Sequence, residues 1–318
     1  MSKSVKIWLI IGTSLVLIGA IIFAGVMMAL NWDFTKLSTV KYETNEYEIT
    51  QGYKNIKVIT DTADIVFIPS ENTKVVCYEE TKQKNLITVK DNTLVIEAES
   101  KKWYEHIGIN FGSTKIEVYI PAGEYGALTV KASTGNTEIP KEYNFESIDI
   151  SKSTGGVKCL ACASGDIEIK TSTGNINVEN ITAGSLNLIA STGKVTVSNV
   201  ECVGDLSVKV STGKATLESV KCNDVISTGS TGDIKLENVI ADENIDIKRS
   251  TGDIKIDGCD AGELIIKTDT GDVKGTLLSD KVFITKTDTG SIKVPETLSG
   301  GKCKITTDTG DIKIEIKK

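Results

Sequence analysis

The sequence predicts an all-β fold, a parallel β-solenoid (β-helix) of about 19–20-residue coils, preceded by one transmembrane helix. Three observations predict it. An uncharged run opens the chain, the triplet Ser/Asp-Thr-Gly then recurs ten times, and apolar residues alternate with polar ones on both sides of each triplet.

The opening run, Ile7 to Leu30, contains 24 uncharged residues, and about 20 are needed for a helix to cross a bilayer. Lys3 and Lys6 precede it, so the positive-inside rule predicts a cytoplasmic tail over 1–6, an anchor over 7–30 and an extracytoplasmic remainder in the cell membrane. The alternative is a cleaved signal peptide. Such a peptide has a shorter apolar core and small residues at its cleavage site, unlike Met27-Met28-Ala29.

The triplet spacing is the strongest signal in the chain. Its intervals are all 19 or 20 residues. The triplets end at Gly135, Gly155, Gly174, Gly193, Gly213, Gly232, Gly252, Gly271, Gly290 and Gly310. So regular a period indicates stacked units of one structural kind.

Alternation around each glycine predicts strands with one buried face. Ile245 and Ile247 precede Gly252, and Ile254 and Ile256 follow it, with polar residues between. The glycine permits a tight corner. A weaker half-repeat predicts a second corner, at Gly165, Gly184, Gly204 and Gly262. Each coil therefore has about two strands and stacks roughly 4.8 Å from the next.

The invariant threonine of the triplet, from Thr134 to Thr309, shares parity with the apolar positions. We therefore expect it to point inward as a hydroxyl ladder. The alternative, an ice-binding array, requires paired Thr-x-Thr rows that point outward. The residues that approach this pattern are Thr268, Thr270, Thr287, Thr289, Thr307 and Thr309, and parity predicts that they point inward.

The same register recovers an earlier copy from Ile56 to Phe67, with Ala63 in place of the glycine. Residues 72–112 then form an insertion with a hairpin across Asp91-Asn92. The predicted divisions are 31–53 (juxtamembrane linker and first strand), 54–130 (N-terminal capping coil with hairpin insertion) and 131–318 (β-solenoid of STG/DTG repeats).

Most of the seven cysteines fall in predicted core columns. Cys162 and Cys259 share one column, and Cys202 and Cys222 share another. Buried cysteine packs as a small apolar side chain. A disulfide between Cys202 and Cys222, which lie in adjacent coils, is the open alternative.

Composition and motifs offer little catalytic chemistry. The net charge of −7 argues against a nucleic-acid partner, and the chain has one histidine, His106, and one arginine, Arg249. We predict no catalytic residues, no cofactor and no metal beyond weak calcium candidates. These candidates are Asp269, Asp288 and Asp308.

Two readings of the aspartates as enzyme groups are weaker. Asp288-Thr289-Gly290 spells an aspartic-protease triplet, but it belongs to the repeat series and no apolar strand runs directly into it. Parallel solenoids also house polysaccharide-processing enzymes with paired carboxylates. No long loop builds a cleft here, and no tryptophan follows Trp103. The carboxylates available for that chemistry are Asp233, Asp253, Asp272 and Asp311.

The last strand predicted, with Ile312, Ile314 and Ile316 pointing inward, has nothing after it to cover its outer side. We therefore expect the C-terminal edge to be open, either blunted by the terminal lysines or available to a partner by strand addition.

Several of these segments together resemble a bacterial "putative adhesin" family of unknown function. They are the anchor, Ile56 to Pro69 (IKVITDTADIVFIP), Ile116 to Pro121 (IEVYIP) and the STGD-like coils, so that the resemblance covers about residues 45–318. It implies a parallel β-solenoid, association with the cell envelope and, for some members, a setting beside stress-response regulators. It supplies no catalytic residues.

The sequence thus predicts a non-enzymatic, membrane-anchored, extracytoplasmic, adhesin-like β-solenoid. Its expected partner is a cell-wall polymer or an envelope protein, or it supports the cell-envelope stress response. A polysaccharide-processing β-helix enzyme is the alternative.

Overall fold

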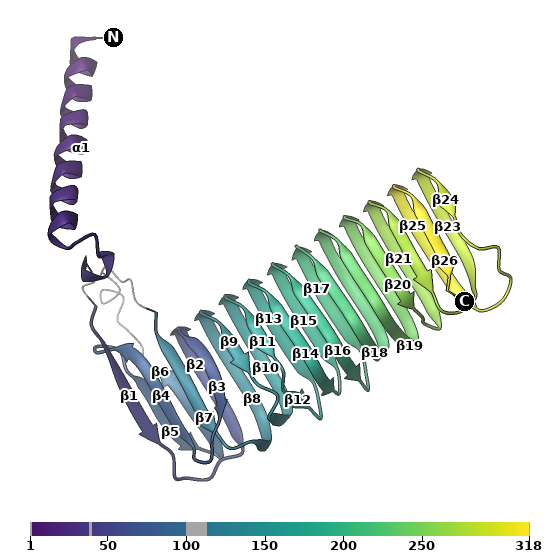
Figure 1. The fold of residues 1–318 in the computed structure, drawn as a ribbon, viewed down its shortest axis with the longest axis horizontal. Coiled ribbons are helices and arrows are strands. Elements are labelled where there is room, and N and C mark those ends of the chain that lie inside the picture. The colour runs from purple at the N-terminus through teal and green to yellow at the C-terminus, as the bar shows by residue number, and fades with distance from the viewer. Residues whose placement is uncertain (1, 38–39, 100–112, 318) are drawn as a thin grey trace.

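The chain folds as one helix followed by a long rod of stacked β-strands (Figure 1). The computed structural model describes residues 2–37, 40–99 and 113–317. His106 and Trp103 lie outside these ranges. The prediction of an all-β parallel solenoid behind one apolar helix is confirmed.

The helix, α1 (Lys3–Ala29), is followed by a short 3₁₀ turn, η1 (Phe34–Leu37). The Ser2 side chain caps its start by accepting a hydrogen bond from the backbone N–H of Val5. Its most apolar 18-residue stretch has a mean hydropathy of 2.6, and none of it is buried. By length and composition α1 can cross a membrane, as an anchor or as a signal sequence.

The N-terminal end of the rod, which we call the head, mixes parallel and antiparallel strands. Its strands are β1 (Tyr42–Glu48), β2 (Asn55–Thr62), β3 (Asp64–Pro69), β4 (Lys74–Glu80), β5 (Asn85–Lys90), β6 (Thr93–Ala98) and β7 (Lys115–Ile120). The predicted hairpin is confirmed, because β5 and β6 pair antiparallel across Asp91 and Asn92, which both have positive φ. The first coil, β2 and β3, pairs in parallel with β6 and β7 on one side and with β8 and β9 on the other.

Strands β8 to β26 form the rest of the rod. They are β8 (Gly123–Thr134), β9 (Thr137–Ile139), β10 (Tyr143–Thr154), β11 (Val157–Cys159), β12 (Cys162–Ala163), β13 (Ile167–Thr173), β14 (Ile176–Ala183), β15 (Leu186–Thr192), β16 (Val195–Cys202), β17 (Leu206–Thr212), β18 (Ala215–Thr231), β19 (Ile234–Thr251), β20 (Ile254–Cys259), β21 (Glu263–Thr270), β22 (Val273–Leu277), β23 (Lys281–Thr289), β24 (Ile292–Lys293), β25 (Gly301–Thr309) and β26 (Ile312–Ile316).

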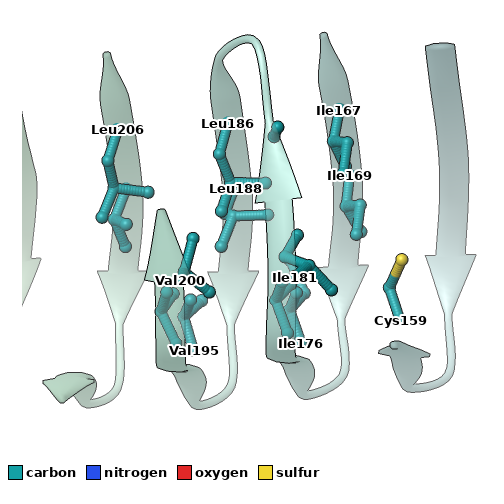
Figure 2. Packing of buried hydrophobic residues seen from close by; sticks show 14 of the residues in the cluster. Cys159, Ile167, Ile169, Ile176, Ile181, Leu186, Leu188, Val195, Val200 and Leu206 are labelled. Atoms are coloured by element: carbon teal, nitrogen blue, oxygen red, sulfur yellow. The ribbon is translucent and has the colours of Figure 1, made fainter. Parts of the chain in front are cut away.

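Two parallel sheets enclose the core between them (Figure 2). One sheet contributes residues seven and five before each corner glycine, such as Leu186 and Leu188. The other contributes residues two and four after it, such as Val195 and Val197. Each of these four side chains is at most 1% exposed, so every coil buries its apolar face against the opposite sheet and the neighbouring coils.

The corner glycines are required by both backbone angle and space. Gly232 has φ +119°, and a Cβ atom there would lie 2.1 Å from the carbonyl oxygen of Gly213 in the preceding coil. Each corner therefore rests directly on the backbone of the corner beneath it, and a side chain would push the coils apart.

A further bend, in four successive coils, was not predicted. Asn180, Asn199, Ser219 and Asn238, six residues after successive corner glycines, all have φ between 52° and 56°. The left-handed residue shifts the alternation of buried and exposed side chains by one position. The apolar residues two positions before it and one position after it therefore both point inward. Asparagine adopts this conformation more readily than most residues.

The order of the last coils corrects a second expectation. β25 pairs with β21 on one side and β23 on the other, and β26 lies between β22 and β24 (Figure 1). Thus β23–β24, although earlier in the sequence, form the end coil, and β25–β26 lie between this coil and β21–β22. The prediction that Ile312 to Ile316 forms an open last strand is wrong, and β23 and β24 form the end of the rod.

Three features of the sequence explain this order. Pro295 follows β24 and cannot donate to a ladder, so a short strand that stops there suits the end of a sheet. The inserted order gives β22 five paired residues in β26 rather than the two that β24 offers. Gly301 also fits tightly under Gly262, whose carbonyl oxygen would lie 1.7 Å from an added Cβ atom.

The inserted order predicts which engineered disulfides form. Lys267 faces Thr306 across β21 and β25, so Lys267→Cys with Thr306→Cys should oxidise readily, because adjacent parallel strands lie within reach of a disulfide. Lys267→Cys with Lys286→Cys should not, because β25 separates them by roughly 9.6 Å. Mass spectrometry after oxidation measures both. The reverse result would show that the coils stack in chain order.

Candidate functional site

The calcium candidates come together on the corner of the last coils. The inserted order places Asp308 between Asp269 and Asp288, because Thr307 and Thr309 pair with the neighbours of both. Lys267 lies 3.7 Å from the Asp269 carboxylate and Lys286 lies 2.9 Å from that of Asp288. Across residues 2–37, 40–99 and 113–317, no group of three His, Cys, Asp or Glu side chains is placed to hold a metal ion.

The carboxylates that follow the corner glycines accept hydrogen bonds from the backbone of the neighbouring coil while staying partly exposed. Asp253 Oδ1 accepts the backbone N–H of Asp272 at 2.9 Å, and Asp272 Oδ1 accepts that of Asp311 at 2.8 Å. Asp233 accepts from Asp253, and Asp311 accepts from both the N–H and the hydroxyl of Ser291. These side chains therefore join successive corners, which gives a structural reason for the Asp that follows the repeated glycine.

The prediction that the triplet threonines, Thr134 to Thr309, point inward is wrong, because all ten are exposed. The alternation ends three residues before the glycine, where Thr268 and Thr307 are buried. Their hydroxyls donate to the carbonyls of Gly252 and Gly271. The next two residues end the strand, where the ladder becomes irregular, and both turn outward, so the surface carries a threonine column beside a Ser/Asp column.

Two cations are buried at that same inward position. Lys152 donates to the Thr137 hydroxyl at 2.9 Å, and burial lowers its pKa to about 8. Arg249 donates to the carbonyl of Val210 at 2.7 Å and fills space left by Gly229, and burial lowers its pKa as well. Neither cation faces a groove identified in the described chain.

The cysteines are unpaired, and six of the seven are buried. Cys202 and Cys222 occupy the predicted core column, and burial together with contact from the Cys202 thiol raises the pKa of Cys222. Cys162 departs from its predicted place: it is half-buried, and its sulfur accepts the N–H of Thr182, while Ala161 takes the core position.

A shallow groove of about 430 Å³ follows the unpredicted bend across four coils. Asn180, Asn199, Ser219 and Asn238 line it, one from each coil, and the Asn199 side-chain amide donates to the Asn180 amide oxygen at 3.1 Å. Its charged lining residues are Glu201 and Lys221, which have opposite sign. The groove is thus nearly neutral, and its lining combines amide and hydroxyl groups with apolar side chains, which are Ile181, Val200, Val220 and Ile240. We call it the asparagine groove.

The sequence contained the signal for this groove, because Asn180 and Asn199 are 19 residues apart and Asn238 lies two coils further on. Alternation alone does not mark a left-handed residue, so the bend is not apparent from the apolar pattern.

This geometry defines a parallel β-solenoid with regular outer columns and a shallow groove along four of its coils. The chain belongs to the Toastrack DUF4097 family, whose model matches residues 53–204 and 201–318. The predicted resemblance to an adhesin-like family of unknown function is confirmed. No curated protein matches the sequence.

Several solved structures are similar to the chain. A "putative adhesin" from Bacteroides fragilis has 15% identity and a TM-score of 0.41, over 86% of this chain and 97% of its own. One from Parabacteroides distasonis has 13% identity and a TM-score of 0.47, over 86% and 98%. A "putative lipid binding protein" from the same species has 17% identity and a TM-score of 0.43, over 87% and 98%. Membership of the family rests on the sequence match to the Toastrack domain.

The corner carboxylates predict an acid-sensitive rod. Hydrogen bonds from Lys274 and the Asp311 N–H hold the pKa of Asp272 below its usual value, and those from Ser291 lower that of Asp311. A carboxyl with a lowered folded-state pKa stabilises the fold above its unfolded pKa near 4, and this stabilisation is lost as pH falls through the lower value. Thermal unfolding temperature should therefore drop below about pH 4.

The variant Asp272→Asn separates charge from hydrogen bonding. Its amide oxygen still accepts the Asp311 N–H, so the variant should fold at pH 7 and lose less stability than the parent between about pH 4 and pH 2. Asp272→Ala, which removes the acceptor, should be less stable at both pH values. Equal acid slopes for parent and Asp272→Asn would contradict the role of this carboxylate.

Proposed function

We propose that this chain is a non-enzymatic, adhesin-like rod, anchored by α1 in the cell membrane, that binds an extended envelope glycan along the asparagine groove. The single observation that carries the proposal is the groove itself. It presents equivalent hydrogen-bonding side chains from four successive coils in line with the rod axis.

The chemistry of the groove favours a neutral polymer with many hydroxyl groups. Amides such as Asn180 and Asn199 offer both donors and acceptors, and the opposite charges of Glu201 and Lys221 leave no strong field for a polyanion. Since neighbouring coils lie roughly 4.8 Å apart, a polymer lying along the rod would meet a similar group at each coil. Individually weak contacts then act together over the length of the groove.

The geometry of the carboxylates supports binding over polymer cleavage. A glycosidase requires one carboxyl as acid and a second as base or nucleophile, both free to act on the substrate. Asp253 and Asp272 each accept a backbone N–H of the next coil, and Asp272 also pairs with Lys274 at 2.6 Å. A role in the envelope stress response is implied by the family resemblance, and glycan binding by an anchored rod is compatible with it.

The groove predicts a specific loss of binding. Asn180→Gly, Asn199→Gly and Asn238→Gly in combination should keep the fold, because glycine adopts the left-handed bend and Gly258 already occupies this position with φ 60°. Losing several amide contacts should weaken binding roughly tenfold or more. Co-sedimentation with purified peptidoglycan and titration with soluble chitin oligosaccharides measure it.

The control for this experiment is Lys209→Ala, which removes an exposed side chain from β17 on the other sheet and should bind as the parent does. Equal binding by the triple variant and the parent would exclude the groove. Release of shortened polymer by the parent would favour the enzyme alternative, and absence of binding to either probe would contradict a neutral glycan ligand.

The anchor predicts an accessible C-terminus. Lys3 and Lys6 lie on the N-terminal side of the apolar stretch, so the rod should lie outside the cytoplasm. Protease added to intact protoplasts should remove a C-terminal tag, while a tag before Lys3 stays protected. Recovery of the rod free in the medium, without its first 30 or so residues, would instead identify a cleaved signal peptide.

A further inference from the structure

The end of the rod, formed by β23 and β24, is an open cross-section of the solenoid. Within the described chain β23 pairs only with β25, and β24 only with β26. Ile292 is 45% exposed, whereas Ile312, its neighbour in the same inward column, is fully buried. Ile284 on the outer face of β23 is 50% exposed. The exposure of Ile292 therefore reflects the absence of a further coil.

This edge is only partly protected against pairing. β24 has two residues and is followed by Pro295, β23 carries Lys286, and the Thr297 hydroxyl donates to the Lys281 carbonyl at the start of β23. No charged side chain points inward along the middle of β23. The inward residues of β23 are the uncharged Phe283, Thr285 and Thr287. Lys281 begins β23 but is only 4% exposed, and its ammonium pairs with the partly exposed Asp260 carboxylate at 2.7 Å. It is therefore unable to repel an added strand.

The shape of the open end determines what kind of partner surface can cover it. Two strands joined by the corner at Gly290 enclose an apolar interior, so a single added strand would cover one sheet and leave the other open. Another coil end covers both. The head of a second copy is unsuitable, because antiparallel strands lie at its edges and β1 carries three glutamates. The matching surface is the same end of a second copy.

The charges on β23 are compatible with this pairing. Lys286 and Asp288 both point outward. In an antiparallel two-fold arrangement about Thr285, the middle of β23, Lys286 lies opposite Ile284 and Asp288 opposite Val282 of the second copy, so no like charges lie directly opposite each other. We propose that the chain forms a tail-to-tail dimer through β23 and β24, in which two solenoids join into one continuous rod. The two α1 helices then lie at opposite ends of the doubled rod.

The first test measures the mass of the full-length chain in detergent micelles by light scattering over a concentration series. The parent should form dimers, and Ile284→Lys with Ile292→Lys should raise the dissociation constant by at least about tenfold. The matched control is Ile226→Lys, since Ile226 lies in the same outward column as Ile284, is 38% exposed and sits in the middle of the rod. This control should dimerise as the parent does.

The second test distinguishes a dimer formed through the β23–β24 end of the rod, the tail, from a dimer formed through α1. Leu298, which is 99% exposed beside the end coil, becomes a labelling site as Leu298→Cys, in a background with Cys162→Ser because the other cysteines are buried. Energy transfer between donor-labelled and acceptor-labelled copies should be strong. The equivalent label at Glu71→Cys in the head should give little transfer.

The outcomes decide the proposal even if the lysine variant fails to fold, because the labels leave β23 and β24 unchanged. A monomer at all concentrations overturns it. So does a dimer with strong transfer from the head and none from the tail, which would indicate contact through α1. A folded lysine variant that dimerises like the parent overturns it as well, and the proposed glycan binding is unaffected by any of these results.

Discussion

The rod depends on the contact of glycine with glycine at one corner of every coil. Gly232 rests on Gly213 so closely that an added Cβ atom would lie 2.1 Å from its carbonyl oxygen. The absence of a side chain lets the corners stack at the spacing of the hydrogen-bonded strands and leaves the corner backbone partly outside the strand ladders. The following residue then supplies the missing acceptor, as Asp253 does for the N–H of Asp272. The repeated STGD pattern is therefore a description of how one corner is built and joined to the next.

Much of the fold could be predicted because the period and the alternation both arise from stacking. The direction of individual side chains near the corner could not. Thr268 and Thr270 share parity and both lie in β21, yet the first is buried and the second is exposed, because the ladder of paired residues skips Asp269 between them. Parity predicts direction only where the ladder is regular. The same limit concealed the bend at Asn199, where a left-handed residue adds one position and restores apolar contacts on its far side.

The order of the final coils shows a different limit. Repeats predict that consecutive coils are neighbours, and for nearest-neighbour stacking that is the simplest arrangement. Here Pro295 shortens β24, while Phe283 adds the one aromatic ring to a column that is otherwise aliphatic apart from Cys303. The short strand and the large ring destabilise the stack least at the end of the rod, where one side of the coil has no neighbouring coil. The later, more regular coil, β25–β26, therefore lies inside, and the candidate edge moves from the C-terminus to β23.

The asparagine groove and the open end differ in what they require of the solenoid. The groove exists because four coils repeat one backbone bend, so its ligand must be repetitive and its affinity grows with the number of coils engaged. The end exists once per chain, and its specificity comes from matching a complete coil cross-section. In a structure held together only by contacts between neighbouring coils, the middle is the most rigid part and the end coil the most easily displaced. Repetitive recognition therefore suits the middle of the rod, and a single, saturable contact suits its end.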